Sequence, residues 1–224
     1  MIFRFFYLKI ILSVSFLLSS QLLAFQIAPI VLSEELLNRQ ESIGQHLLTA
    51  ADPKKEMTPA TIMNGNFNER FSDLGGKKAL SYGINPWPFW GYFVVDNSKL
   101  GLEEIILEAG YSAIDRITVY RVSESGAILF QQTLGDVLPF SERPIKYRHP
   151  AYPLQIGPEK SYFLVKIETT SNVFFDFKIY SSYGFKNAKL TELIFVGILL
   201  GGIVTIFFYN LFLFLTIRDR NYGY

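Results

Sequence analysis

The spacing of apolar residues along this chain changes from one segment to the next. The first such segment is a short continuous run of apolar residues. It covers residues 10–18, follows the basic residues Arg4 and Lys9, and gives way to small and polar residues. This order is typical of a secretory signal peptide, which we predict over residues 1–24. An N-terminal membrane anchor of the same composition is the alternative. Residues 25–41 then form a lead-in with mixed helical signals and no clean apolar stripe.

The middle of the chain changes to a period of two. Phe163, Val165 and Ile167 fall on one face of an extended segment, and the charged residues that follow Val165 and Ile167 fall on the other. Strands with one buried face have this alternation.

Other segments define the sheet architecture. Residues 116–134 are typical of a hairpin whose turn ends at Gly126, a residue that tolerates positive φ. Residues 87–97 are apolar on both faces, as expected of a central strand. Residues 173–180 alternate as one further strand. With roughly seven or eight strands and no helix long enough for a parallel crossover, we predict an all-β antiparallel sandwich over residues 42–185.

A long uncharged run closes the pattern. No residue from Leu193 to Ile217 is charged, and a helix of about 25 residues is longer than the hydrocarbon layer, which is about 30 Å thick. We predict one transmembrane helix over residues 190–217. Basic residues lie on both sides of this helix, so their distribution gives little preference for either orientation in the membrane. The orientation therefore follows from the predicted signal peptide, which directs the N-terminal side across the membrane. The sandwich is then periplasmic, the helix spans the bacterial inner membrane, and residues 218–224 form a cytoplasmic stub.

Three residues inside this helix indicate helical neighbours. Gly197 and Gly201 have the small-xxx-small spacing that allows two helices to approach closely. Asn210 places a primary amide where lipid offers no hydrogen-bonding partner. We therefore expect helix packing at these positions, with further transmembrane helices as partners within the lipid bilayer. The alternative is that such glycines are common in membrane helices and that Asn210 reaches interfacial water.

Composition narrows the function classes. The chain of 224 residues is 50% hydrophobic and 18% charged, which fits one exported domain plus membrane segments. Its formal net charge of +1 gives no basic surplus, so we expect no nucleic-acid partner. The lack of cysteine excludes disulfides, cysteine-based metal sites and thiol nucleophiles.

The motifs give no support for catalysis. The two histidines, His46 and His149, stand in unrelated contexts, and adjacent Glu103 and Glu104 point to opposite faces of a strand. The sequence has no nucleophile elbow, paired-histidine zinc motif or phosphate-binding glycine loop. We therefore predict no enzyme, no metal site and no cofactor.

Aromatic and basic side chains indicate binding instead. Flat rings stack on sugar faces, while arginine binds hydroxyls or carboxylates. Trp87 and Tyr152 belong to this group of rings, and Lys146 with Arg148 offers a basic edge to an acidic ligand. The alternative is that any one ring is core and that the basic pair is a solvated edge. The candidate ligand-binding residues are Trp90, Tyr92, Tyr111, Arg116, Arg143, Tyr147 and Arg148.

The stretch "LPFSERP", residues 138–144, also has a structural interpretation. Its two prolines bracket a tight connection, in which we expect Phe140 to plug a sheet end and Arg143 to hold loop carbonyls. This interpretation competes with a ligand contact for Arg143.

Several stretches, in this order, resemble one receptor family: "WPFWGYFVVDN", "EAGYSAIDRITVYR", "GDVLPFSERPIKYRHPAYPLQI" and "YNLFLFLTIRDRNYGY". They are similar to the periplasmic domain and first membrane helix of bacterial seven-transmembrane receptors with diverse intracellular signalling modules, the DISM type. The resemblance runs from about Ser42 to Tyr224. This sequence departs from the family plan because six of the seven transmembrane helices and every output module are absent from it. Gly91 and Tyr92 also stand where the family tends to place leucine and arginine, which puts a ligand contact there in doubt.

The resemblance implies a jelly-roll-like sandwich, similar to carbohydrate-binding modules, that senses a carbohydrate or a small acid outside the cell. Further helices then carry the signal to a cytoplasmic histidine kinase, diguanylate cyclase or phosphatase. We therefore predict the sensory part of a membrane signal-transduction receptor, truncated before its remaining helices and output module. The alternative is a stand-alone, membrane-tethered module that binds carbohydrate or a partner without signalling.

Overall fold

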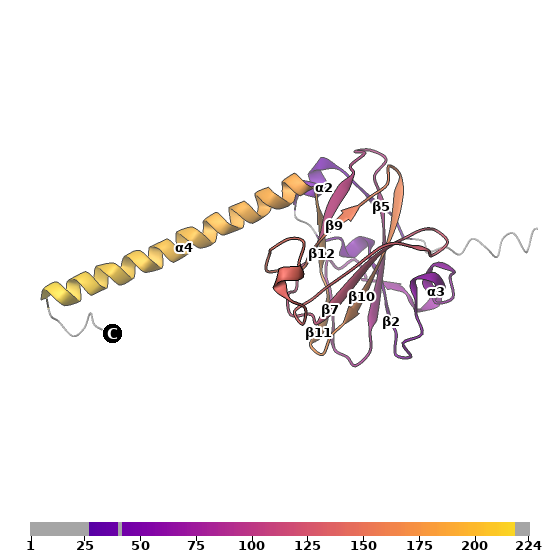
Figure 1. Ribbon diagram of the computed structural model, residues 1–224, viewed down its shortest axis with the longest axis horizontal. Coiled ribbons are helices and arrows are strands. Elements are labelled where there is room, and N and C mark those ends of the chain that lie inside the picture. The colour runs from indigo at the N-terminus through magenta and orange to yellow at the C-terminus, as the bar shows by residue number, and fades with distance from the viewer. Residues whose placement is uncertain (1–26, 40–41, 218–224) are drawn as a thin grey trace, which may run out of the picture. The chain divides into compact units, whose positions relative to one another are not determined.

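The computed structural model describes residues 27–39 and 42–217, which form two compact units (Figure 1). One unit ends at Tyr180 and carries the strands, and the other begins at Ser181 and consists mainly of one helix. The predicted signal peptide and cytoplasmic stub lie outside the described residues.

The larger sheet has the strand order β3-β2-β5-β10-β7-β8, and β1 pairs in parallel with the end of β5. The other pairs are antiparallel, with β5 and β10 in the middle. Its strands are β1 (Ile30–Val31), β2 (Leu48–Ala51), β3 (Ser72–Asp73), β5 (Phe89–Asp96), β7 (Arg116–Val122), β8 (Ile128–Leu134) and β10 (Lys160–Glu168).

A three-stranded sheet of order β12-β6-β9 packs across the core from the larger sheet, and a two-stranded sheet pairs β11 with β4. Their strands are β4 (Leu80–Ile84), β6 (Glu104–Ala109), β9 (Ala151–Gln155), β11 (Asn172–Phe175) and β12 (Phe177–Tyr180). Buried side chains from all three sheets form one contiguous cluster. The unit is therefore an antiparallel β-sandwich, which confirms the predicted fold class.

Helices in this unit are short: α2 (Glu34–Arg39), α3 (Pro59–Met63) and 3-10 turns at Gly44–His46, Asn68–Arg70 and Phe140–Glu142. Thr58 caps α3, because its hydroxyl accepts a hydrogen bond from Thr61 N (3.2 Å). The turn between β7 and β8 packs on α3 at Gly126, which has φ +81°. A Cβ there would lie 2.8 Å from Ala60 Cα, so this turn requires glycine on two grounds.

β5 is buried on both faces because two separate apolar clusters cover it. Phe93 lies in the main core, where its ring stacks on Phe163 of β10 at a centroid distance of 5.2 Å. Trp90 and Tyr92, on the opposite face, join a second buried cluster with Ile62 of α3. Burial on both faces confirms the prediction of a central strand.

The segment 173–180 was predicted as one continuous strand, and this prediction is wrong. It forms β11 and β12, which separate at Asp176 because the chain changes partner there, from β4 to β6. The carbonyl oxygen of Asp176 accepts a hydrogen bond from Gly110 N (2.7 Å) at the break. The alternation continues across it, and the four apolar side chains assigned to the inner face are all buried: Val173, Phe175, Phe177 and Ile179.

The described part of the lead-in packs with the sandwich. β1 pairs with Val95 and Asp96 of β5, and Ile30, Leu32 and Leu37 lie in the main core. The sequence pattern does not assign this segment to the sandwich. Its two-residue strand and six-residue helix are too short to produce a periodic signal.

The helix α4 (Ser182–Ile217) is long and apolar enough to cross a membrane, and it begins before the predicted start at residue 190. Asn210 Nδ2 donates a hydrogen bond to Ile206 O (3.0 Å) within the helix. At about 100° per residue, Asn210 lies roughly opposite Gly197 and Gly201 on the helix surface. Helix packing at these three residues stays a prediction.

Replacing Gly135 by alanine is expected to destabilise the sandwich. A Cβ at Gly135 would overlap the carbonyl oxygen of Asp115, a backbone atom that has no alternative rotamer. Overpacking of this kind costs about 1–3 kcal/mol, so the midpoint of thermal unfolding, followed by circular dichroism of the full chain in detergent, should fall. Gly157→Ala is the matched control, because the nearest atom to its Cβ is 3.8 Å away. Equal midpoints for the two variants would contradict this packing.

Candidate functional site

One end of the sandwich carries a cleft of about 450 Å³, which we call the Trp87 cleft. The loops before β5 and β7 and after β2, β8 and β10 converge there, because these strand ends share one edge of the antiparallel sheet. Its volume is typical of sites that bind small ligands. The residues that give it chemistry are Lys55, Trp87, Asp115, Arg116, Thr169 and Thr170.

Trp87 provides an apolar surface of the cleft, together with Pro86 and Pro88. Its ring is partly buried against the main core. The indole Nε1–H is buried and has no acceptor among the described residues.

Asp115 links two loops beside the cleft. Its Oδ2 accepts hydrogen bonds from Thr170 N (2.8 Å) and Thr170 Oγ1 (2.9 Å), and its Oδ1 accepts one from Thr169 Oγ1 (3.2 Å). The backbone hydrogen bond from Thr170 is the main cause that lowers the pKa of Asp115. The carboxylate is therefore ionised at neutral pH and already occupied by donors of the protein.

Two cations that line the cleft make no side-chain hydrogen bond or ion pair within the described structure. Arg116 begins β7 directly opposite Glu168 of β10. Glu168, however, is paired with Lys166 at 2.9 Å. Lys55 has φ +55°, a left-handed conformation that is uncommon outside glycine. Both cations remain available to a ligand.

The buried carboxylate of Asp52 fixes the loop that carries Lys55. Its Oδ1 accepts a hydrogen bond from Glu56 N (3.0 Å), and its Oδ2 accepts from Met57 N (3.1 Å) and Trp90 Nε1 (3.4 Å). The backbone of Lys55 also donates to Asp52 O (3.1 Å). Because the loop is held on both sides of Lys55, its strained backbone is maintained by the surrounding structure.

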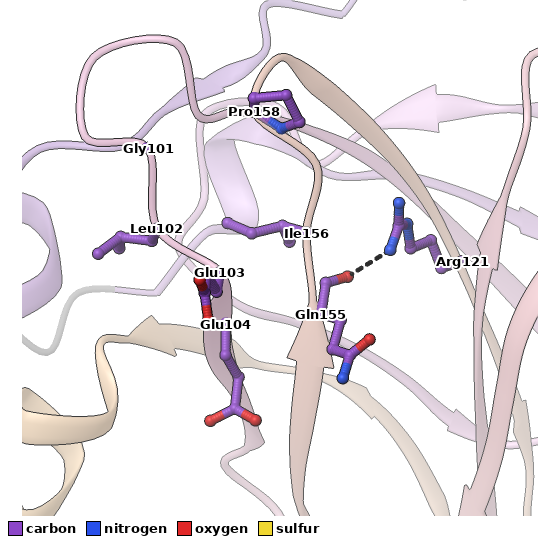
Figure 2. Close-up of a pocket in the computed structure, with 8 residues that line it drawn as sticks. All are labelled: Gly101, Leu102, Glu103, Glu104, Arg121, Gln155, Ile156 and Pro158. Carbon is purple, nitrogen blue, oxygen red and sulfur yellow. Dashed lines mark hydrogen bonds between the residues drawn. The ribbon is translucent and has the colours of Figure 1, made fainter.

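A second cleft, of about 470 Å³, lies at the opposite strand ends (Figure 2). It is formed by the loop before β6 and the loop after β9, and its basic residue is Arg121 of β7. Arg121 Nη1 donates to Gln155 O (3.0 Å), and Figure 2 shows the Glu104 side chain pointing away from this pair. None of the residues drawn is aromatic. The Trp87 cleft, with an indole and two unpaired cations, is the better candidate site.

A family model described as 7TMR-DISM extracellular 2 matches residues 44–181, more than half of the chain. The chain belongs to this family. The match confirms the resemblance that the motifs indicate. No curated protein matches the sequence.

Two solved structures resemble this 7TMR-DISM domain remotely. TmCBM61 in complex with β-1,4-galactotriose has 9% identity and a TM-score of 0.31, and the match covers 69% of this chain and 100% of that chain. A carbohydrate-binding module of the β-sandwich superfamily, described as having promiscuous specificity, has 8% identity and a TM-score of 0.30. That match covers 68% of this chain and 61% of that chain.

Among the predicted ligand-binding residues of this 7TMR-DISM domain, Trp90 and Tyr92 lie inside the second buried cluster. They are 1% and 4% exposed. Trp90 stacks on Tyr120 at a centroid distance of 5.7 Å, and Lys166 lies over its ring at 5.8 Å. Burial raises the pKa of Tyr92 well above its usual value. Neither side chain presents a surface to solvent, so we no longer include them in the candidate site.

The other predicted residues are distributed over separate parts of the 7TMR-DISM sandwich. Tyr111 packs edge-on against Phe174 at 5.7 Å, and Arg148 lies over Tyr147 at 5.9 Å. Neither pair lines the Trp87 cleft. Of the predicted residues, only Arg116 lies there.

Lys55, Asp115, Thr169 and Thr170 were not selected from the sequence of the domain. Trp87 was counted among the rings but was not selected as a ligand-binding residue. The only local signal for this site is that polar residues directly flank strand ends, as Asp115 precedes β7 and Thr169 follows β10. Such residues are common in ordinary turns, so the signal does not single them out.

Arg143 is a structural residue of the connection that contains "LPFSERP". Its Nη1 donates to Tyr147 O and Arg148 O (both 2.9 Å), and its Nη2 donates to Gly135 O (3.3 Å). Its guanidinium is therefore occupied by loop carbonyls, as the structural interpretation predicts. Phe140 does not plug a sheet end, because it is 53% exposed and lies against the Arg143 guanidinium instead.

Lys146 also serves this connection. Its Nζ donates to the carbonyl oxygens of Ser141 and, at 2.8 Å, Arg143. The basic edge expected from Lys146 and Arg148 is thus reduced, because one of its two charges is used within the loop. The histidines lie apart: His149 contacts Glu108 at 3.1 Å, and His46 contacts Ala28 O at 3.1 Å.

We expect Arg143→Gln to lower the midpoint of thermal unfolding. The change removes hydrogen bonds to three backbone carbonyls, and each carbonyl left buried and unpaired costs about 1–3 kcal/mol. Arg116→Gln is the matched control, because its exposed side chain makes no such bond and should change stability by only about 0.5 kcal/mol. Circular dichroism of both variants checks this. A larger loss in Arg116→Gln would refute the two assigned roles.

Asp115 gives a pH-dependent prediction. Its pKa is lowered from 3.8 in the folded state, so the unfolded chain binds the proton more readily. The stabilisation is fully present above 3.8 and is lost as the pH falls through the lower folded value. The unfolding midpoint of the unchanged protein should therefore exceed that of Asp115→Asn at neutral pH and approach it in acid. Asp136→Asn, which changes an exposed carboxylate without a side-chain hydrogen bond among the described residues, should lack this trend.

Proposed function

We propose that this chain is the ligand-sensing, extracytoplasmic part of a bacterial membrane signal-transduction receptor, and that its ligand binds in the Trp87 cleft. The family to which the chain belongs supports an extracellular domain. The observation that carries the choice of site is the combination of an indole, two unpaired cations and threonine hydroxyls in one cleft.

A carbohydrate or a small acid fits the chemistry of this cleft best. An indole and two prolines offer a flat apolar surface for a sugar ring, and the cations bind its oxygen atoms. The cleft contains no arrangement of nucleophile and base, so we propose binding without catalysis.

In the proposed topology, α4 crosses the inner membrane, the sandwich is periplasmic and the C-terminus is cytoplasmic. The length and apolar composition of α4 support a single span in this chain. Gly197 and Asn210, on roughly opposite sides of α4, support contacts with more than one further helix. Such helices would connect the sandwich to a cytoplasmic kinase or diguanylate cyclase.

The binding proposal is tested with the full chain in lipid nanodiscs. A glycan array and a thermal-shift screen of small acids identify a ligand, and its dissociation constant is then measured by calorimetry. We expect Trp87→Ala to weaken binding about tenfold or more, because an aromatic stack and its buried area are lost. Trp87→Phe, which keeps an aromatic ring, should retain part of the affinity.

Phe140→Ala is the matched control, because this exposed ring lies outside the cleft. Its dissociation constant should equal that of the unchanged protein. Binding that survives both Trp87 variants would place the ligand elsewhere. Failure of every glycan and acid to bind would contradict the sensing role.

A further inference from the structure

We infer that the Trp87 cleft takes a carboxylate-bearing sugar, such as a uronic acid at the end of an acidic glycan, rather than a neutral sugar or a simple organic acid. This inference rests on the proposed function and specifies its ligand. It depends on which charges of the cleft are already neutralised by the protein and which are not.

The carboxylates beside the cleft already have partners within the protein. Asp115 accepts hydrogen bonds from Thr169 and Thr170 through both of its oxygens. Glu168 is paired with Lys166 at 2.9 Å. A ligand donor or cation would have to displace these interactions, so the cleft does not favour a cationic ligand.

The positive charges of the cleft are available. Neither Arg116 nor Lys55 has a side-chain partner within the described residues, although each lines the same cleft. The contrast with the second cleft is direct, since Figure 2 shows the guanidinium of Arg121 bound to Gln155 O. A guanidinium and an ammonium with free donors match a carboxylate, which accepts through two oxygens.

The backbone of Lys55 is held in position by the protein itself. Its backbone has φ +55°, and the hydrogen bonds that Asp52 accepts from Glu56 N and Met57 N fix the loop around it. A residue kept in a sparsely populated conformation by its surroundings is a frequent feature of binding sites. A fixed backbone reduces the conformational freedom that this loop loses when the Lys55 ammonium binds an anion.

The apolar part of the cleft distinguishes a sugar from a simple acid. Trp87 and its two flanking prolines offer a surface that acetate or a similar small anion cannot cover, whereas a pyranose ring can. The site therefore fits an anion and a ring in one molecule.

The test uses the full chain in lipid nanodiscs of uncharged lipid and matched pairs of ligands. Each pair contains a uronic acid oligomer and the neutral oligomer of its parent sugar, in the gluco, galacto and manno series. Acetate and citrate are the simple acids. We expect at least one uronic acid oligomer to bind about tenfold or more tightly than its neutral counterpart, with the preference decreasing at high salt.

Arg116→Gln and Lys55→Gln should each remove most of this preference, because each weakens binding of the acidic oligomer much more than binding of the neutral one. Lys77→Gln removes an exposed cation outside the cleft and is the matched control, which should change neither affinity. Circular dichroism of each variant separates loss of binding from loss of fold.

The outcomes separate this inference from the proposed function. Equal binding of acidic and neutral oligomers overturns the inference and leaves the sensing role supported. Equal binding of acetate or citrate overturns the assignment of a sugar. A preference for acidic oligomers that survives both cation variants assigns the carboxylate to another site. If no probe binds, the proposed function is contradicted together with the inference.

Discussion

The burial of β5 on both faces, with β10 paired beside it, is the constraint on which the rest of the sandwich depends. Phe93 and Phe163 stack in the main core, while Trp90 and Leu164 lie in the second cluster under α3. A one-residue slip between these strands would exchange the two faces, so their register is strongly specified. Because the register is fixed, the ends of β2, β5, β7 and β10 lie at one edge, and the loops that form the Trp87 cleft start from positions that cannot shift independently.

Most strands of the sandwich can be predicted from the local pattern of apolar and polar residues. The elements that cannot be predicted in this way share one cause. The alternation in β10, the uniform burial of β5 and the turn at Gly126 each depend on residues close in sequence, so the pattern predicts them. The break at Asp176 and the pairing of β1 with β5 depend instead on partners far away in the chain. A strand that changes partner keeps its period of two, because alternation reports only which side is buried.

The binding site is less accessible to sequence reasoning than the fold. Aromatic content draws attention to Trp90 and Tyr92, yet on a strand with two buried faces every aromatic is core. Trp87 differs because it lies between two prolines just before β5, where the chain has not yet entered the sheet. Arg143 and Arg116 are both arginines in the sequence, and only their surroundings separate them. Loop carbonyls accept hydrogen bonds from Arg143, whereas the Arg116 side chain has no partner among the residues that the structure describes. Family membership supports a sensory domain without selecting any of these residues.

The charges of the Trp87 cleft also bear on how binding there can act as a signal. A ligand shifts a conformational equilibrium only by its difference in affinity for the two states. Arg116 and Lys55 both line this cleft, and the carboxylate of Asp115 beside them is already engaged with Thr169 and Thr170. In the proposed site, an anion that attracts both cations would link the loop after β2 to the start of β7. Under the proposed function, states that bring this loop and strand together would be favoured when an anion is bound, which is the differential interaction that a sensor requires.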